Sequence, residues 1–287
     1  MPNYKVAHSP DADDIFMYYA IAFGWISAGD LRLANFAADI ETLNEAAIAG
    51  IYDATAISFA LYPHIWRDQA LLRTAASFGQ GYGPKLIRRK DRALKRDFKA
   101  ALSGRRTTNA LLFRAAYPNA RAIYMNFLEI ENAVLRGEAD AGVLIHESIL
   151  DFSDELLVEA EIWDIWRELA AADLPLPLGG MCLRRSLPLN RAIELEDVLT
   201  RAVRIAIEHK ELLSKMLAER DLVRVDLATL NKYLSLYANE DSAVIGDRQR
   251  RGVEALFKIG YDLGEYKELV DLDRAFIPSE YAALRGF

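Results

Sequence analysis

Short apolar segments and amphipathic segments alternate along the first part of the chain. Apolar runs of about four to eight residues between turn-forming residues are typical of buried strands, and apolar residues recurring every three or four positions are typical of helices. The pattern therefore predicts an α/β fold. The expected strands are 4–8, 31–38, 54–59, 71–77, 84–90, 122–125, 141–145 and 180–186. One expected helix begins at residue 9, and others span residues 41–49, 62–67, 110–116 and 130–136. Amphipathic helices are expected across about 195–257.

One pattern occurs twice along the chain. Residues 46–59 (AAIAGIYDATAISF) and 133–146 (AVLRGEADAGVLIH) each read as the end of a helix, a glycine, an aspartate turn and a strand. Gly50 and Gly137 stand where the helices end, and glycine takes the left-handed conformation there without a steric penalty. Two equivalent units predict two similar α/β lobes that face each other.

The ends of the two repeated strands are candidate functional positions. The first strand ends near Ser58 and the second near His146. In open α/β sheets, ligands bind outside the carboxyl ends of the strands. His146 is therefore either a working group of a site or a hydrogen-bonded histidine at a strand end, and the local sequence leaves both interpretations open.

Two basic strand ends suggest where the chain passes between the lobes. Residues 84–90 (PKLIRRK) and 180–186 (GMCLRRS) look alike, and we interpret them as the connections into and out of a central lobe. The segment LPLPLGG at 174–180 predicts a rigid, extended connector, because proline restricts the backbone. The predicted lobes are a larger one of residues 1–90 and 183–287, with a helical C-terminal part, and a smaller one of residues 91–182.

Two predicted helix starts carry hydroxyl groups and exposed amides. Ser9 is a favourable N-cap and Pro10 is favoured at the first helical position. Ser9 and the amides after it could bind an anion, but nearby aspartates disfavour a strongly anionic partner, and a well-capped core helix is the alternative. Before residue 110, Thr107 or Thr108 is the expected N-cap. Its hydroxyl, the exposed amides and Arg105 or Arg106 could together hold a carboxylate. Simple capping beside a solvated arginine is the alternative there.

The composition narrows the class of protein. The net charge is −7, the pI is about 5.3 and the apolar fraction is 52%, so we expect no nucleic-acid binding through the overall field. The one cysteine, Cys182, excludes an intrachain disulfide and is assigned to packing. With no signal-peptide pattern and no apolar run of about 20 residues, a cytosolic protein that does not enter a membrane is expected. The four histidines lack metal-binding spacing, and no GxSxG elbow or cofactor signature occurs.

Seven short motifs occur in the order typical of one protein family. They are SPDADDIFMYYA at 9–20, IETLN at 40–44, TAIS at 55–58, GYGP at 81–84, GRRTTNA at 104–110, IHES at 145–148 and LPLPLGG at 174–180. With them the chain resembles the 1,4-dihydroxy-6-naphthoate synthases of the futalosine route to menaquinone. That family lies in a wider group that includes chorismate dehydratases and is similar to type II periplasmic solute-binding proteins. The resemblance implies a two-lobed type II periplasmic-binding-protein-like fold with two crossover connections and an interlobe cleft.

The resemblance also implies a carbon–carbon lyase that uses no cofactor and no metal. Family members convert cyclic dehypoxanthine futalosine to 1,4-dihydroxy-6-naphthoate and release dihydroxyacetone, and their proposed general base matches His146. The substrate would be a small carboxylated molecule, which we expect Ser58 and Thr108 to hydrogen-bond from opposite lobes. The residues expected to contact it are Ser9, Ala56, Ile57, Ser58, Arg106, Thr107, Thr108, Asn109, Leu178 and Gly179.

The chain departs from the family pattern at three places. Some members carry Lys where this chain has Ala56, which leaves Arg106 or the helix start as the candidate partner of the substrate carboxylate. Some read SPCPND where this chain reads SPDADD at 9–14. Residues 91–102 lack the usual apolar strand, so the smaller lobe is expected to be trimmed or irregular there. Two alternatives stay open: a non-catalytic cytosolic solute-binding-like protein for a small carboxylated ligand, and a chorismate dehydratase.

Overall fold

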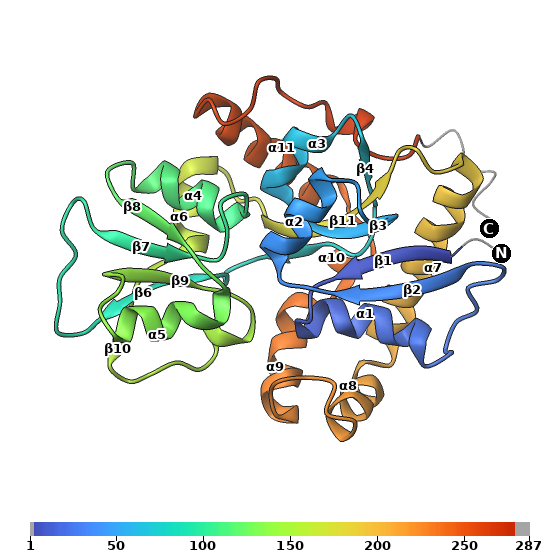
Figure 1. Ribbon diagram of the computed structural model, residues 1–287, viewed down its shortest axis with the longest axis horizontal. Helices are drawn as coiled ribbons and strands as arrows, with labels where there is room; N and C mark the ends of the chain where they lie inside the picture. Colours follow the sequence, from blue (N-terminus) through green and yellow to red (C-terminus); the bar gives the residue numbers. More distant parts are fainter. Residues whose placement is uncertain (1–2, 279–287) are drawn as a thin grey trace.

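The computed structural model describes residues 3–278, except for the side chains of residues 12, 13 and 15–17. The chain forms two α/β lobes, each built on its own sheet (Figure 1). The lobe on the right of Figure 1 contains the N-terminal part and the helices after residue 189, and the lobe on the left contains the middle of the chain. The predicted two-lobed α/β fold is confirmed.

The first sheet lies in the larger lobe. Its order is β2 (Arg32–Ala37), β1 (Asn3–His8), β3 (Ala54–Ser58), β11 (Leu176–Arg184) and β4 (Gln69–Leu71), and β5 (Ser77–Gly79) also pairs with β11. β1, β2 and β3 run parallel, and β11 lies beside β3 in the antiparallel direction. Gly179 of β11 pairs with Ser58, so these two residues meet at the carboxyl end of β3.

The second sheet repeats this order in the smaller lobe. It comprises β8 (Arg121–Tyr124), β7 (Lys99–Leu102), β9 (Ala141–Leu144), β6 (Lys85–Arg89) and β10 (Leu156–Glu161). β7, β8 and β9 are parallel, and β6 is antiparallel to β9 just as β11 is to β3. The similar sequences PKLIRRK and GMCLRRS therefore belong to equivalent strands of two sheets.

Helices pack on both sheets, and the C-terminal helices return to the larger lobe (Figure 1). That lobe contains α1 (Ala12–Ala22), α2 (Ile40–Ile48), α3 (Tyr62–Ile65), α7 (Leu189–Glu208), α8 (Lys210–Glu219), α9 (Leu227–Tyr237), α10 (Glu240–Ala243) and α11 (Asp247–Asp262). The smaller lobe contains α4 (Thr108–Ala116), α5 (Ile130–Leu135) and α6 (Ile162–Ala170). The 3-10 helices are η1 (Phe59–Leu61), η2 (Phe127–Glu129), η3 (His146–Ile149) and η4 (Leu272–Arg274). Within residues 3–278 no helix combines the length and apolar character needed to cross a membrane.

The sequence repeat produces the same local structure in both lobes. Gly50 and Gly137 follow α2 and α5 with φ values of 63° and 72°, in the left-handed region that glycine adopts without strain. Three residues later, the carboxylates of Asp53 and Asp140 each accept a hydrogen bond from a backbone amide of the neighbouring parallel strand, at 2.8 Å in both cases. Each aspartate therefore ties its own strand to the next.

The boundaries between the lobes lie earlier than the sequence analysis places them. The chain enters the smaller lobe between β5 and β6 and returns between α6 and β11. The expected boundaries near residues 90 and 182 therefore assign β6 and most of β11 to the wrong lobe. The basic residues at these positions are the ends of paired strands, not of linkers.

Three other expectations are wrong. Residues 71–77 do not form one strand, because β4 ends at Leu71 and β5 begins at Ser77. LPLPLGG is not a connector but leads into β11, whose pairing with β5 shifts between Pro177 and Gly179, which suits a proline without an amide to donate. The expected trimming of the smaller lobe is also wrong, since β7 occupies residues 99–102 inside its sheet, whereas residues 91–98 are irregular as expected.

Candidate active site

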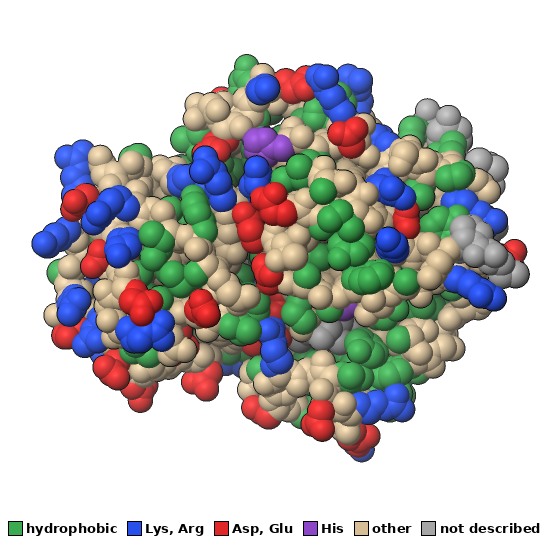
Figure 2. All heavy atoms as spheres, in the orientation of Figure 1, with side chains coloured by type: hydrophobic (Ala, Val, Ile, Leu, Met, Phe, Trp, Pro, Cys, Tyr) green, Lys and Arg blue, Asp and Glu red, His purple; other side chains and the backbone are tan. Residues whose placement is uncertain are grey.

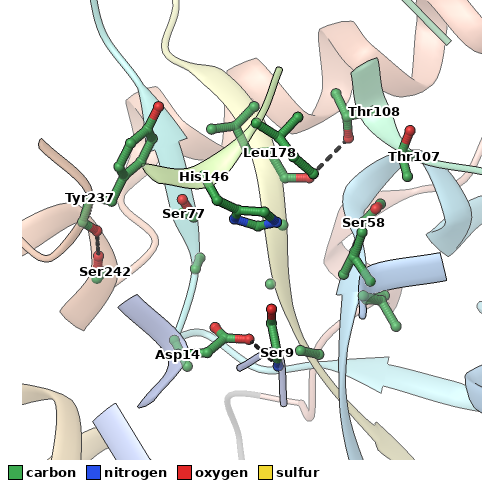
Figure 3. A pocket seen from close by; sticks show the side chains of 18 of the residues that line it. Ser9, Asp14, Ser58, Ser77, Thr107, Thr108, His146, Leu178, Tyr237 and Ser242 are labelled. Atoms are coloured by element: carbon green, nitrogen blue, oxygen red, sulfur yellow. Dashed lines mark hydrogen bonds between the residues drawn. The ribbon is translucent and has the colours of Figure 1, made fainter. Parts of the chain in front are cut away.

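A cavity lies between the two lobes, at the carboxyl ends of β3 and β9 (Figure 3). It contains about 930 Å³ of empty space, part of it open to solvent. Its walls are mainly apolar, with several hydroxyl groups among them. The sequence-predicted residues that line it are Ser9, Ala56, Ile57, Ser58, Thr107, Thr108, Asn109, His146, Leu178 and Gly179.

His146 reaches into this cavity from the smaller lobe (Figure 3). It follows β9 and begins η3, with a φ of 54° that is unusual for a residue other than glycine. Its Nε2 lies 2.8 Å from Oδ2 of Asp11, a residue of the larger lobe. The ring of Phe127 meets the imidazole edge to face, with centroids 5.0 Å apart. Both lobes therefore contribute to the position of the imidazole.

Asp11 is a fully buried carboxylate with several polar neighbours. It accepts hydrogen bonds from the Ser9 hydroxyl and the Arg224 guanidinium, in addition to its contact with His146. Burial by itself raises the pKa of Asp11, but His146, Ser9 and Arg224 together outweigh burial and hold this pKa below its ordinary value. Asp11 is therefore ionised at neutral pH.

Arg224 lies in the loop between α8 and α9 and joins the two lobes. Besides Asp11, its guanidinium lies 3.4 Å from Glu147 and over the ring of Phe127, 5.1 Å from the centroid. Sequence reasoning missed both Asp11 and Arg224. The sequence marks Asp11 only as one of several acids at a helix start, and Arg224 is 213 residues away in a region without motifs.

The first helix begins later than expected, because Ser9 is not its N-cap. α1 begins at Ala12, with Asp11 in the N-cap position. The hydroxyl of Ser9 donates to Asp11, and its backbone amide donates to the carboxylate of Asp14 at 2.7 Å (Figure 3). Ser9 lines the cavity, but both of these groups are engaged with carboxylates. This turn is therefore arranged around acids and not prepared for an anion.

Ser58 lines the cavity from the larger lobe and is held by Asn44 of α2. The side chain of Asn44, which is completely buried, accepts from the backbone amide of Ser58 at 3.0 Å and donates to its hydroxyl oxygen at 3.3 Å. Since Asn44 supplies a donor to Oγ, the hydroxyl proton of Ser58 can point toward a ligand.

Thr108, at the start of α4, connects the lobes (Figure 3). Its hydroxyl donates to the carbonyl oxygen of Leu178 at 2.9 Å and accepts from the amide of Ala60 at 3.3 Å. A hydrogen bond from this hydroxyl to a substrate would have to replace the one to Leu178. Thr107 is the N-cap of α4, because its side chain accepts from the amide of Ala110 at 3.2 Å.

Arg106 does not reach the cavity, contrary to expectation. Its guanidinium pairs with Glu45 of α2 and lines a separate depression on the surface. The described residues that line the cavity include neither Lys nor Arg. Within residues 3–278, Asn109 Oδ1 and Ser103 Oγ, both in the cavity lining, are buried without a hydrogen-bond partner. A ligand carboxylate here would meet amide and hydroxyl groups near the start of α4.

Residues 4–262 match a family model described as menaquinone biosynthesis. The chain belongs to the menaquinone biosynthesis family. A relative from Streptomyces coelicolor, named 1,4-dihydroxy-6-naphthoate synthase, is 31% identical over 250 residues, which cover 85% of this chain and 87% of that protein. A Thermus thermophilus protein of the same name is 28% identical over 258 residues, which cover 90% and 93%.

Solved structures agree with the fold of this member of the menaquinone biosynthesis family. Protein AF1704 from Archaeoglobus fulgidus is 31% identical, with a TM-score of 0.84 over 92% of this chain and 98% of that one. The alkanesulfonate-binding protein SsuA from Xanthomonas axonopodis is 11% identical, with a TM-score of 0.70 over 96% and 97%. The second likeness shows the fold alone, which is that of periplasmic binding proteins.

The opposite wall of the cavity comes from the C-terminal helices of this family member. Tyr233, Tyr237 and Ser242 lie there, and sequence reasoning missed them because this region carries no motif.

On the face shown in Figure 2, acidic and basic side chains are interspersed over both lobes. In the part of the chain that the structure describes, no group of three or more His, Cys, Asp and Glu residues is placed to hold a metal ion.

Asp14→Asn should stabilise this family member at neutral pH. Burial raises the pKa of Asp14, which lines the cavity beside Asp11, to about 6. The folded state therefore favours the protonated carboxyl, and stability is lost as the pH rises from about 4 to above 6. Because one pKa unit is about 1.4 kcal/mol, the variant should gain on the order of 2 kcal/mol in the free energy of unfolding at pH 7.5, measured in urea.

The gain in the free energy of unfolding should vanish near pH 4, and the exposed Asp151→Asn should show no gain at either pH. An equal gain at both pH values would contradict the assignment.

Proposed function

We propose that this protein acts in the cytoplasm as a 1,4-dihydroxy-6-naphthoate synthase, which converts cyclic dehypoxanthine futalosine to 1,4-dihydroxy-6-naphthoate and releases dihydroxyacetone. The observation that carries the proposal is His146, held against a buried carboxylate in the cavity between the lobes. A neutral imidazole accepts a proton near pH 7, which suits the base of an elimination. The likeness to two enzymes of this name over most of the chain supports the same choice.

The remaining roles follow from the cavity lining. The hydroxyl of Ser58 donates a hydrogen bond to the substrate from the larger lobe. Backbone amides at the start of α4 and the hydroxyl of Ser103 hold the substrate carboxylate, because a helix N-terminus favours anions. The amide oxygen of Asn109, which can only accept, binds a hydroxyl group of the substrate. The apolar walls accept the aromatic ring, and the closed lobes keep water away from a carbanion-like intermediate.

The proposal is tested by turnover of defined substrates. Purified protein is incubated with cyclic dehypoxanthine futalosine and, separately, with chorismate, and the products are identified by mass. We expect 1,4-dihydroxy-6-naphthoate and dihydroxyacetone from the first and no reaction with the second. Dehydration of chorismate would assign the protein to the chorismate dehydratases. Tight binding of either compound without turnover would favour a solute-binding protein.

Ser58→Ala should lower kcat/KM roughly five- to thirtyfold. This corresponds to a loss of about 1–2 kcal/mol of transition-state stabilisation, the range for a lost hydrogen bond in a site. The variant keeps the backbone amide that binds Asn44, so the end of β3 should stay in place. Steady-state kinetics with cyclic dehypoxanthine futalosine measure the change, and the exposed Ser186→Ala is the matched control. Unchanged kinetics would remove Ser58 from the substrate contacts.

A further inference from the structure

The contact between His146 and Asp11 crosses the cleft. His146 follows β9 in the smaller lobe, whereas Asp11 precedes α1 in the larger one, and their side chains are 2.8 Å apart. Arg224, also from the larger lobe, binds the same carboxylate and reaches Glu147, the residue after the histidine. The imidazole and its carboxylate therefore meet across the boundary between the two lobes.

We propose that Asp11 is a positioning residue for His146: its carboxylate accepts a hydrogen bond from the protonated Nε2, so that Nδ1 carries the lone pair that takes a proton from the substrate. This inference rests on the proposed function and deepens it. A neutral imidazole carries one proton, and the hydrogen bond of one nitrogen fixes which nitrogen that is. When Nδ1 takes the proton, the electron pair of the broken bond stays on the substrate, and the imidazolium charge lies beside the carboxylate.

The surroundings of Asp11 keep its carboxylate in this orientation. The side chain has no exposed surface, and the Ser9 hydroxyl and the Arg224 guanidinium donate to its two oxygens. A buried carboxylate with a fixed orientation is suited to select one tautomer of the ring. The left-handed backbone of His146 brings the ring to this carboxylate, and such conformations cluster at functional sites.

Kinetics with two variants test the electrostatic part of the proposal. Asp11→Asn keeps the size of the side chain but removes its charge, and kcat should fall about 10²-fold or more with little change in KM. The acid limb of the pH profile should move to lower pH, because the imidazolium loses its anionic partner. Arg224→Gln should move the limb to higher pH, because a neighbouring cation is removed. If Asp11 only supported the fold, Asp11→Asn and Arg224→Gln would not shift the pH profile in opposite directions.

The titratable and charged groups on the elements around the imidazole are Asp11, Asp14, Glu147, Arg224, Tyr233 and Tyr237.

Nitrogen NMR tests the tautomer without any turnover. In ¹⁵N-labelled protein, at a pH above the titration of its four histidines, the His146 ring should show a protonated Nε2 and an unprotonated Nδ1. The spectra are recorded without ligand and with 1,4-dihydroxy-6-naphthoate, and His146→Asn assigns the signals. In Asp11→Asn the ring should show a mixture of tautomers, whereas the exposed Asp151→Asn should leave it unchanged.

The outcomes separate this inference from the proposed function. A native protein that turns over the substrate while Asp11→Asn keeps native kcat and pH profile would overturn the positioning role. A ring protonated on Nδ1 in both spectra would also overturn it, whether or not the enzyme is active. If Asp11→Asn does not fold, the native ring spectrum decides: a protonated Nε2 supports the positioning role, and a protonated Nδ1 overturns it. Absence of turnover in the native protein refutes the proposed function and leaves the tautomer measurement intact.

Discussion

His146→Asn should lower kcat by about 10²–10⁴-fold, the usual contribution of a general base. The variant retains a polar side chain of similar size but has no group that takes a proton near neutral pH. Asparagine also tolerates the left-handed backbone at this position, with its φ of 54°, better than most residues do. The variant should therefore fold and bind substrate, and the loss should appear in kcat and not in KM. Single-turnover and steady-state rates with cyclic dehypoxanthine futalosine measure it.

The same experiment decides between the two interpretations of His146 that the sequence leaves open. Near-native turnover in His146→Asn would make it a structural histidine and place the base elsewhere. In the native enzyme, activity should fall at low pH, because a protonated imidazole cannot accept a proton. His209→Asn is the matched control, since His209 lies between α7 and α8 and is not among the residues that line the cavity.

Trp166→Ala should lower the free energy of unfolding by about 3–5 kcal/mol, as large-to-small changes of buried aromatic residues do. Trp166 lies on α6 with no exposed surface, and its indole N–H donates to the carbonyl oxygen of Leu174 at 2.8 Å. α6 contacts α4 in its own lobe and α11 from the other. The substitution therefore removes packing near the point where the chain returns to the larger lobe. Urea denaturation measures the change.

Trp166→Phe separates packing from hydrogen bonding at the same position. It keeps an aromatic ring but leaves the carbonyl oxygen of Leu174 without its donor, so a smaller loss of about 1–3 kcal/mol is expected. Equal losses in the two variants would assign the effect to the hydrogen bond. A loss below about 1 kcal/mol in Trp166→Ala would contradict the tight packing around this indole.

The sequence predicts the architecture well where local signals agree with tertiary contacts. Gly50 and Gly137 stop helices in both lobes, and the strands that follow end at the cavity. It fails where pairing with distant strands decides. Residues 99–102 (KAAL) have little strand propensity, yet they form β7 because β8 and β9 pair with them on both sides. LPLPLGG carries strong turn residues, yet it enters the first sheet beside β3 and β5.

The candidate site shows the same division between local and distant information. Short motifs at strand ends and at a helix start identify Ser58, Thr108 and His146, and all three line one cavity. The partners of the imidazole cannot be found in this way. Asp11 and Arg224 are far apart in the chain, and neither lies in a pattern that identifies a ligand of the histidine. Their role depends on how α1 and the loop before α9 pack together, and only the folded chain contains that information.

The position of β11 has a consequence for how the protein is made. β11 lies between β3 and β4, although the chain builds the whole smaller lobe before it reaches residue 176. During synthesis on the ribosome, the smaller lobe is complete in sequence while the larger sheet still has an open edge at β3. An unpaired strand edge is a site of aggregation. The nascent chain must therefore protect the ATAIS edge until its last neighbour emerges, and the half of the cavity that contains Ser58 is the last to assemble.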